Sequence, residues 1–269
     1  MPTIVAAQTD TQLNTYGSGA GTGDGLGAGG GWMEARRNDG QTGTISVVGT
    51  NGNGNMLYPW FKSTHKYYIY RYFIAFDVSG ISVAPSSATF KLYAPGGIST
   101  SPNGILVKVN AGANIGLSSD ADADDWIELA GYVDNATMDG NVTVYSAHAS
   151  PVFTAGTAFN DITLNAAACS DIASLSVFKM ALIEYTYDYT NTTYSGNETA
   201  GWKRQLYGTF AGSGTEAERP YIDYVAGVAS GWGGTTAGKG KKIGSTVSAD
   251  TKTILGVSSV NTAKILGIE

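Results

Sequence analysis

The chain has 269 residues, of which 42% are hydrophobic and only 14% are charged, and it carries a net charge of −6. We expect no nucleic-acid partner, because phosphate binding needs clustered Lys and Arg and the one basic cluster, Lys239–Lys242, is small. We also expect no membrane partner, since no apolar run approaches the roughly 18 residues of a membrane span. The N-terminus lacks the basic flank and long apolar stretch of a secretory signal, which predicts synthesis in a cytoplasm as a mature chain.

Glycine occupies every odd position from Gly17 to Gly31, with Gly30 added. In an extended arm these glycines would share one face and let another backbone approach closely. The alternative is a flexible glycine loop. A phosphate-binding loop is not indicated, because the Gly-Lys-Ser/Thr ending that such a loop needs is missing.

Alternating hydrophobic and polar residues predict β-strands from residue 43 to residue 225. The predicted strands are Gly43–Val48, Tyr67–Asp77, Ala88–Tyr93, Ile105–Val109, Trp126–Leu129, Val142–Tyr145, Phe159–Leu164, Val177–Tyr187, Gln205–Phe210 and Tyr221–Val225. Asn-Gly, Pro-Gly-Gly, Asp-Gly and Ser-Gly sequences between them are typical of tight turns. At most, Asn165–Ala173 forms one or two helical turns. The pattern predicts an all-β fold, an antiparallel jelly-roll β-sandwich over residues 1–226.

Burial can be predicted for a few individual side chains. In the strand Ala88–Tyr93, the alternation places Ala88, Phe90 and Leu92 inward and the intervening residues outward. Cys169 is the only cysteine, which excludes an intrachain disulfide. It has no His nearby in the sequence, so we expect a small buried residue there.

An acidic segment places Asp120, Asp122 and Asp124 at alternating positions. Three carboxylates on one side of an extended loop are a candidate calcium site, because Ca²⁺ takes six to eight oxygen ligands. The Gly and the final Glu of an EF-hand loop are missing, however. The alternative is a solvated acidic loop.

Aromatic residues crowd the segment from residue 58 to residue 72. They are Tyr58, Trp60, Phe61, Tyr67, Tyr68, Tyr70 and Tyr72. Exposed rings on a jelly-roll can stack on sugar faces, so host glycans are a candidate ligand. The alternative is that the rings are there for their β-propensity alone.

Catalysis is not expected, because a nucleophile, a base and an orienting group have to converge. His65 and His148 lie in separate polar segments with no diagnostic neighbours. Glu184 and Asp188 have the residue types of a glycosidase acid pair, but we expect both at a solvent-facing strand end. The chain is therefore predicted not to be an enzyme.

The C-terminal segment contains a sequence that repeats with a period of eleven residues, at Ser248–Val257 and Ser259–Ile268, after a Gly/Lys spacer over residues 227–242. Residues 243–269 are too short to bury their own apolar side chains, so they need a surface from their own domain or from neighbouring chains. We interpret them as an assembly tail. The predicted assembly residues are Ile254, Leu255, Gly256, Ile265, Leu266 and Gly267.

Several core segments follow a family pattern. Tyr70-Arg-Tyr-Phe-Ile-Ala-Phe-Asp-Val-Ser-Gly-Ile81 followed by Ser87-Ala-Thr-Phe-Lys-Leu-Tyr93 resembles the signature of DNRLRE-type, disaggregatase-related jelly-roll domains, with Phe90 at the usual Leu position. The later segments that are similar to this family are Phe159–Asn165, Phe178–Asp188 and Glu218–Val225. The resemblance spans roughly residues 1–226 and is loose in the N-terminal third.

Such domains resemble carbohydrate-binding modules and also occur in structural proteins of bacteriophages. The tail segment Gly256–Ile268 resembles the Gly-Val-x-x-x-Asn-Ile-x-Lys-Ile/Val-x-Gly-Val repeats that close many phage virion proteins, with Thr262 at the usual Ile position.

These resemblances imply a non-enzymatic virion structural protein: a capsid decoration protein, a head fibre, or a tail fibre or spike. It would be made in the host cytoplasm and work outside the cell, as a homo-oligomer in contact with other virion proteins; a trimer is the first hypothesis. One alternative is a carbohydrate-binding module or adhesin that recognises cell-surface glycans. Another is a subunit of a non-viral extracellular filament.

Overall fold

The computed structural model describes residues 1–7, 11–18, 46–49, 53–57, 60–62, 66–94, 103–133, 138–147, 153, 159–192, 201–202, 206–209 and 216–228. Over residues 11–68 and 201–216 the structure describes the backbone of the strands and turns alone. The chain divides into two units, residues 1–226 and 227–269. The strands and helices below all belong to the first unit.

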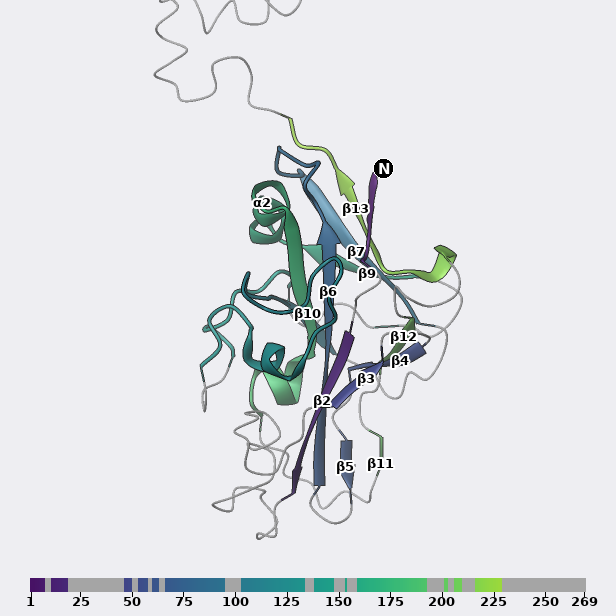
Figure 1. Cartoon of the computed structure of the whole chain (residues 1–269), viewed down its shortest axis with the longest axis vertical. Coiled ribbons are helices and arrows are strands. Elements are labelled where there is room, and N and C mark those ends of the chain that lie inside the picture. Colours follow the sequence, from purple (N-terminus) through teal and green to yellow (C-terminus); the bar gives the residue numbers. More distant parts are fainter. Residues whose placement is uncertain are drawn as a thin grey trace, which may run out of the picture. The chain divides into compact units, whose positions relative to one another are not determined.

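Most of the described strands belong to two antiparallel β-sheets (Figure 1). The first sheet has the strand order β1 (Thr3–Val5), β13 (Tyr221–Val225), β7 (Ser87–Tyr93) and β9 (Phe159–Leu164). The second has the order β11 (Gly201–Trp202), β5 (Trp60–Lys62), β6 (Lys66–Asp77), β10 (Val177–Glu184) and β8 (Gly104–Lys108).

Three further pairings complete the described strands. In the second sheet β2 (Thr11–Ser18) pairs with both β6 and β3 (Ser46–Gly49). A separate ribbon consists of β4 (Asn53–Leu57) and β12 (Leu206–Thr209). The predicted all-β sandwich is confirmed, whereas the jelly-roll connectivity stays a prediction.

The space between the two sheets holds the main hydrophobic core. Ala88, Phe90 and Leu92 of β7 are buried there, as the alternation predicted. Phe90 meets Phe76 of β6 edge to face, with ring centroids 6.2 Å apart, a favoured geometry for aromatic pairs. One-sided burial of β7 thus explains its alternating sequence.

The outer face of the second sheet is covered as well. The segment between β8 and β9 places Trp126, Leu129 and Met138 over this face, where they pack with Phe73 of β6 and Ile183 of β10 in a second core. Strand β10 is therefore buried on both faces along its C-terminal half. That two-sided burial gives a continuous apolar run instead of an alternating pattern.

The short helix α2 (Ala166–Ser174) lies where one or two helical turns were predicted. Asn165 caps it, because its Oδ1 accepts a hydrogen bond from the N–H of Ala168 at 3.0 Å. Cys169 is buried on this helix, which confirms the prediction for it, and burial raises the pKa of its thiol. None of the described helices is long and apolar enough to cross a membrane.

Three strand predictions are wrong. Trp126–Leu129 begins inside the 3₁₀ helix η1 (Ala123–Ile127), because Asp122 and Asp125 form a capping box at its start. Val142–Tyr145 forms only an isolated bridge, between Val144 and Val107. Strand β10 ends at Glu184 and continues as a π-helical turn, η2 (Tyr185–Tyr189), rather than as a strand to residue 187.

Candidate functional site

A pocket opens at the edge of the sandwich where the N-terminal strand passes from one sheet to the other. Strand β1 pairs with β13 in the first sheet. The next residues join the second sheet, since Ala6 bridges Phe76 and the N–H of Ala7 donates to the carbonyl of Ala75 at 2.9 Å. The two sheets are thereby linked beside the end of β6.

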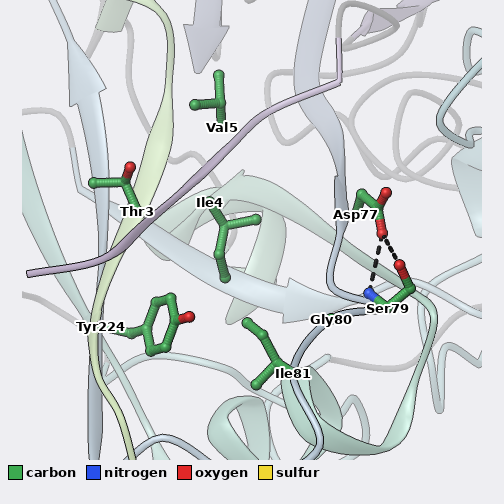
Figure 2. Close-up of a pocket in the computed structure, with 8 residues that line it drawn as sticks. All are labelled: Thr3, Ile4, Val5, Asp77, Ser79, Gly80, Ile81 and Tyr224. Carbon is green, nitrogen blue, oxygen red and sulfur yellow. Dashed lines mark hydrogen bonds between the residues drawn. The ribbon is translucent and has the colours of Figure 1, made fainter.

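We call this site the edge pocket (Figure 2). Its volume is about 420 Å³, within the range of small-ligand sites. Its lining residues are Thr3, Ile4, Val5, Asp77, Ser79, Gly80, Ile81 and Tyr224.

The base of the edge pocket is apolar. Ile4 is buried in the main core, and Ile81 and Tyr224 pack against that core while remaining partly exposed. Figure 2 shows Ile4 and Ile81 between the Tyr224 side and the Asp77 side of the pocket.

One carboxylate stands at the side of the edge pocket. Oδ1 of Asp77 accepts hydrogen bonds from the hydroxyl of Ser79 at 2.6 Å and from the N–H of Ser79 at 3.0 Å. These bonds lower the pKa of Asp77 below its ordinary value, so the group is ionised at neutral pH. Both bonds go to Oδ1, which leaves the lone pairs of Oδ2 for another donor.

The hydroxyl groups of Tyr224 and Ser79 lie on the same side of β1 as Ile4, and that of Ser79 already donates to Asp77. Thr3 alternates with Ile4 along β1 and points to the opposite face of the strand. In Figure 2 the Tyr224 hydroxyl is directed toward the middle of the pocket. The site therefore combines an apolar base with several donors and acceptors.

A buried ion pair lies on the outer face of the second sheet. Nε and Nη2 of Arg71 donate to the two carboxylate oxygens of Asp188, each at 2.8 Å, and both side chains have no exposed surface. Nη1 donates to the carbonyl of Trp126 at 2.6 Å, and the guanidinium lies 3.9 Å from the centroid of the Trp126 ring. Burial lowers the pKa of Arg71, but the charge and hydrogen bonds of Asp188 outweigh it and raise the pKa overall.

The prediction that Glu184 and Asp188 lie at a solvent-facing strand end is wrong, because both are buried. The π-helical turn η2 brings Asp188 back against Arg71 of β6. A carboxylate held by two hydrogen bonds to a buried Arg cannot reach a substrate. Asp188 therefore neutralises Arg71 inside the fold.

The acidic segment forms the start of the 3₁₀ helix η1, with Asp122 as its N-cap. Oδ1 of Asp122 accepts from the N–H of Asp124 at 3.0 Å, and its Oδ2 accepts from Nδ2 of Asn114 at 2.7 Å. Asp120 and Asp124 are exposed. Among the residues that the structure describes, no three His, Cys, Asp or Glu side chains are grouped as metal ligands, and the calcium site stays a prediction.

Sequence reasoning missed the neighbouring Asp125, which is fully buried. Its oxygens accept hydrogen bonds from the N–H groups of Asn114 at 2.6 Å and Ile115 at 2.8 Å. It thereby fastens the loop at residues 114–115 to η1. This role left no signal in the sequence beyond one more acidic residue in an acidic run.

The aromatic segment is divided between core and sheet. Tyr72 has no exposed surface and packs in the main core, so it cannot stack on a sugar. Strands β5 and β6 place Trp60 opposite Tyr68 and Phe61 opposite Tyr67. Tyr70 is partly buried, and Tyr58 lies outside the described residues.

Other predictions also fall outside the described residues. These are the assembly residues Ile254, Leu255, Gly256, Ile265, Leu266 and Gly267, the spacer beyond residue 228, the glycines from residue 19 to residue 31, and His65 and His148.

No protein-family model matches this sequence, and no curated protein is significantly similar to it. The resemblance to DNRLRE-type domains and to phage tail repeats therefore rests on the motifs of this chain alone.

Proposed function

We propose that this chain is a non-enzymatic structural protein of a phage or virus particle, a capsid decoration protein, head fibre, or tail fibre or spike. The sandwich of residues 1–226 is the part displayed, and the tail of residues 243–269 joins copies of the chain to one another and to other virion proteins. A symmetric homo-oligomer, with a trimer as the first candidate, fits repeated burial of small apolar patches.

The sequence that repeats in the tail with a period of eleven residues is the observation that carries this proposal. Its support from the structure is that residues 1–226 form a unit of their own, with two hydrophobic cores built from described residues of that unit. Short apolar repeats that cannot bury their own side chains are typical of segments that bind another surface.

The proposal includes the expectation that the chain has no catalytic activity, and one observation supports it. Asp188, which belongs to the acid pair considered from the sequence, is held by Arg71 and fully buried. That carboxylate serves stability rather than chemistry.

The test is the mass of the full-length protein in solution, measured by analytical ultracentrifugation. We compare the unaltered chain with a variant that carries Ile254→Ser, Leu255→Ser, Ile265→Ser and Leu266→Ser. The proposal expects an oligomer for the unaltered chain and a monomer for the variant.

A matched control removes four exposed apolar side chains from the sandwich instead. Its substitutions are Leu117→Ser, Ile127→Ser, Val133→Ser and Val225→Ser, at positions 39 to 56% exposed. This control should keep the oligomer. If the tail variant keeps the mass of the unaltered chain, the proposed role of the tail is wrong.

A further inference from the structure

We propose that the outer face of the first sheet receives the second tail repeat, Ser259–Ile268, of a neighbouring copy of the chain. This inference rests on the proposed function, since it names the surface to which the assembly tail binds. The centre of this face is a group of aliphatic and aromatic side chains that we call the outer cluster. Its members are Val5, Tyr93, Phe159 and Tyr221.

The pleat of the strands directs the outer cluster away from the main core. Each strand of the first sheet buries one face between the sheets, and the buried residues near its centre are Ile4, Phe90, Ile162 and Ile222. Successive side chains of a strand point to opposite faces. The members of the outer cluster lie one or three positions from these buried residues. They therefore share the face that is turned away from the second sheet.

The outer cluster is continuous across all four strands of the first sheet (Figure 1). Tyr93 of β7 and Phe159 of β9 are cross-strand partners, with ring centroids 5.6 Å apart. The ring of Tyr221 in β13 meets that of Phe159 edge to face at 5.0 Å. Val5 of β1 lies opposite Tyr221. Such a group of aromatic rings is typical of the central part of a protein interface.

The outer cluster remains accessible, unlike the apolar side chains of the second sheet. Val5 is 47% exposed, and the three aromatic rings are partly exposed. Neither of the two hydrophobic cores formed by described residues includes any of the four side chains. On the second sheet, by contrast, Trp126 and its neighbours cover the outer face. An apolar patch left at the surface is typical of a site that binds another chain.

The charges beside the outer cluster suit the second repeat. Nζ of Lys91 pairs with Oδ2 of Asp161 at 2.7 Å and lies 3.9 Å from Oδ2 of Asp223, so the three groups carry one excess negative charge. The side chain of Asp161 is 55% exposed and can accept a second donor. The second repeat contains a single charged residue, Lys264, directly before its Ile-Leu pair. It thus presents aliphatic side chains to the cluster and an ammonium group to Asp161, and that ion pair contributes to register more than to affinity.

The same face of a second copy is the competing occupant. Face-to-face pairing would bring together two surfaces with the same excess negative charge, and it would leave the tail without the surface that it needs. The spacer of residues 227–242, if fully extended, spans up to about 55 Å. That span exceeds about 35 Å, twice the radius of gyration of a compact domain of 226 residues. The tail is therefore long enough to reach a neighbouring copy.

The experiment is photo-crosslinking of the full-length protein. Photoreactive benzoylphenylalanine takes the place of Tyr221, which keeps an aromatic ring in the outer cluster. The matched control carries the same photoreactive residue in place of Val133, which is 56% exposed in the segment that covers the second sheet. A denaturing gel separates covalent dimers from chains that are cross-linked internally. Mass spectrometry of the dimer then identifies the joined residues.

We expect a covalent dimer in which position 221 is joined to residues 259–268, and no such product from position 133. Lys264→Glu should lower the yield of this dimer about threefold, because it places a carboxylate near Asp161. Adding Asp161→Lys to Lys264→Glu should restore the yield, since the charges again attract.

The inference would be overturned by the absence of a dimer from position 221, by cross-links that stay within one chain, or by cross-links that fall outside residues 259–268. An equal yield of tail cross-links from position 133 would also overturn it. The oligomer mass distinguishes these results from a failure of the proposed function. If the tail variant with four Ser substitutions loses the oligomer while position 221 does not cross-link to the tail, the tail binds another surface and only this inference is wrong.

Discussion

Where β6, β10 and β8 pair, the two faces of the second sheet are both buried, but they are built from different chemistry. The face toward the first sheet is apolar, with Tyr72, Phe76 and Phe178 among its fully buried side chains. The outer face is covered by an irregular segment and includes the buried charges of Arg71 and Asp188. Regular strands satisfy their own backbone groups, whereas an irregular cover needs side chains to satisfy some of them.

Arg71 meets that need directly, since it donates to the carbonyl of Trp126 in the cover. Asp125 does the same from within the cover by accepting from two N–H groups. Buried polar side chains therefore help to hold the outer layer in place, whereas the side chains that meet between the two sheets are apolar. Four predictions test this contrast.

The largest effect is expected from Asp188→Ala. It leaves the guanidinium of Arg71 buried without its counter-ion, which costs about 4 kcal/mol of unfolding free energy. Urea unfolding measures it. Adding Arg71→Met to Asp188→Ala should recover about 2 kcal/mol, because the buried charge is then gone. A double variant no more stable than the single variant would contradict the electrostatic account.

Met180→Ala tests the apolar face. Met180 is fully buried between the sheets, and its truncation should cost about 3 kcal/mol through lost burial and a cavity. Adding Arg71→Met to Met180→Ala should not restore any unfolding free energy. The two residues belong to different cores, so the effects of the two substitutions should add. A strong non-additive effect in urea unfolding would mean that the two cores are not independent.

Gly131→Ala tests the backbone of the cover. Gly131 has φ +92°, and a Cβ there would collide with the carbonyl oxygen of Asn141. We expect a loss of about 2 kcal/mol from strain and displacement. Gly140→Ala is the control, because Gly140 has φ +75° with open space around it, and it should cost about 1 kcal/mol. If Gly131→Ala and Gly140→Ala lose the same stability in thermal unfolding, the backbone around Gly131 moves enough to relieve the collision and the prediction is wrong.

The smallest effect concerns alkaline pH. Burial, with the charge and hydrogen bond of Asp139, raises the pKa of Tyr189 in the outer core to about 12. The unfolded chain loses this proton near pH 10, so stability falls as the pH rises from about 10 to about 12. In Tyr189→Phe the fall over that window should be smaller. Identical pH profiles of the melting temperature would contradict the raised pKa.

The sequence located several strands to within a residue. In β7, β9 and β13 the outer faces remain polar, so the alternation is clear, whereas β6 and β8 were found from their apolar, β-branched and aromatic runs although both faces are buried. Strand β1, which has only three residues, was not predicted. The predicted strand Val177–Tyr187 runs past the end of β10, because no local sequence signal indicates the π-helical turn after Glu184. Trp126–Leu129 was predicted as a strand, but the capping contacts of Asp122 and Asp125 start a 3₁₀ helix that includes its first residues.

The candidate sites were less predictable, for a physical reason. Arg71 and Asp188 are 117 residues apart in the sequence, and no periodic pattern couples them. The edge pocket likewise joins Thr3, the turn after Asp77 and Tyr224. Its only local signal is Asp77-Val-Ser-Gly80, whose side-chain to backbone bonds are typical of a turn. The assembly tail differs from these sites, because its repeat can be read directly from the sequence.

The central claim is that this chain is made to assemble through its C-terminal repeats. The most direct measurement is native mass spectrometry of the unaltered full-length protein over a hundredfold range of concentration. We expect a discrete, closed multiple of the 27.9 kDa chain. A single 27.9 kDa species at every concentration would contradict it.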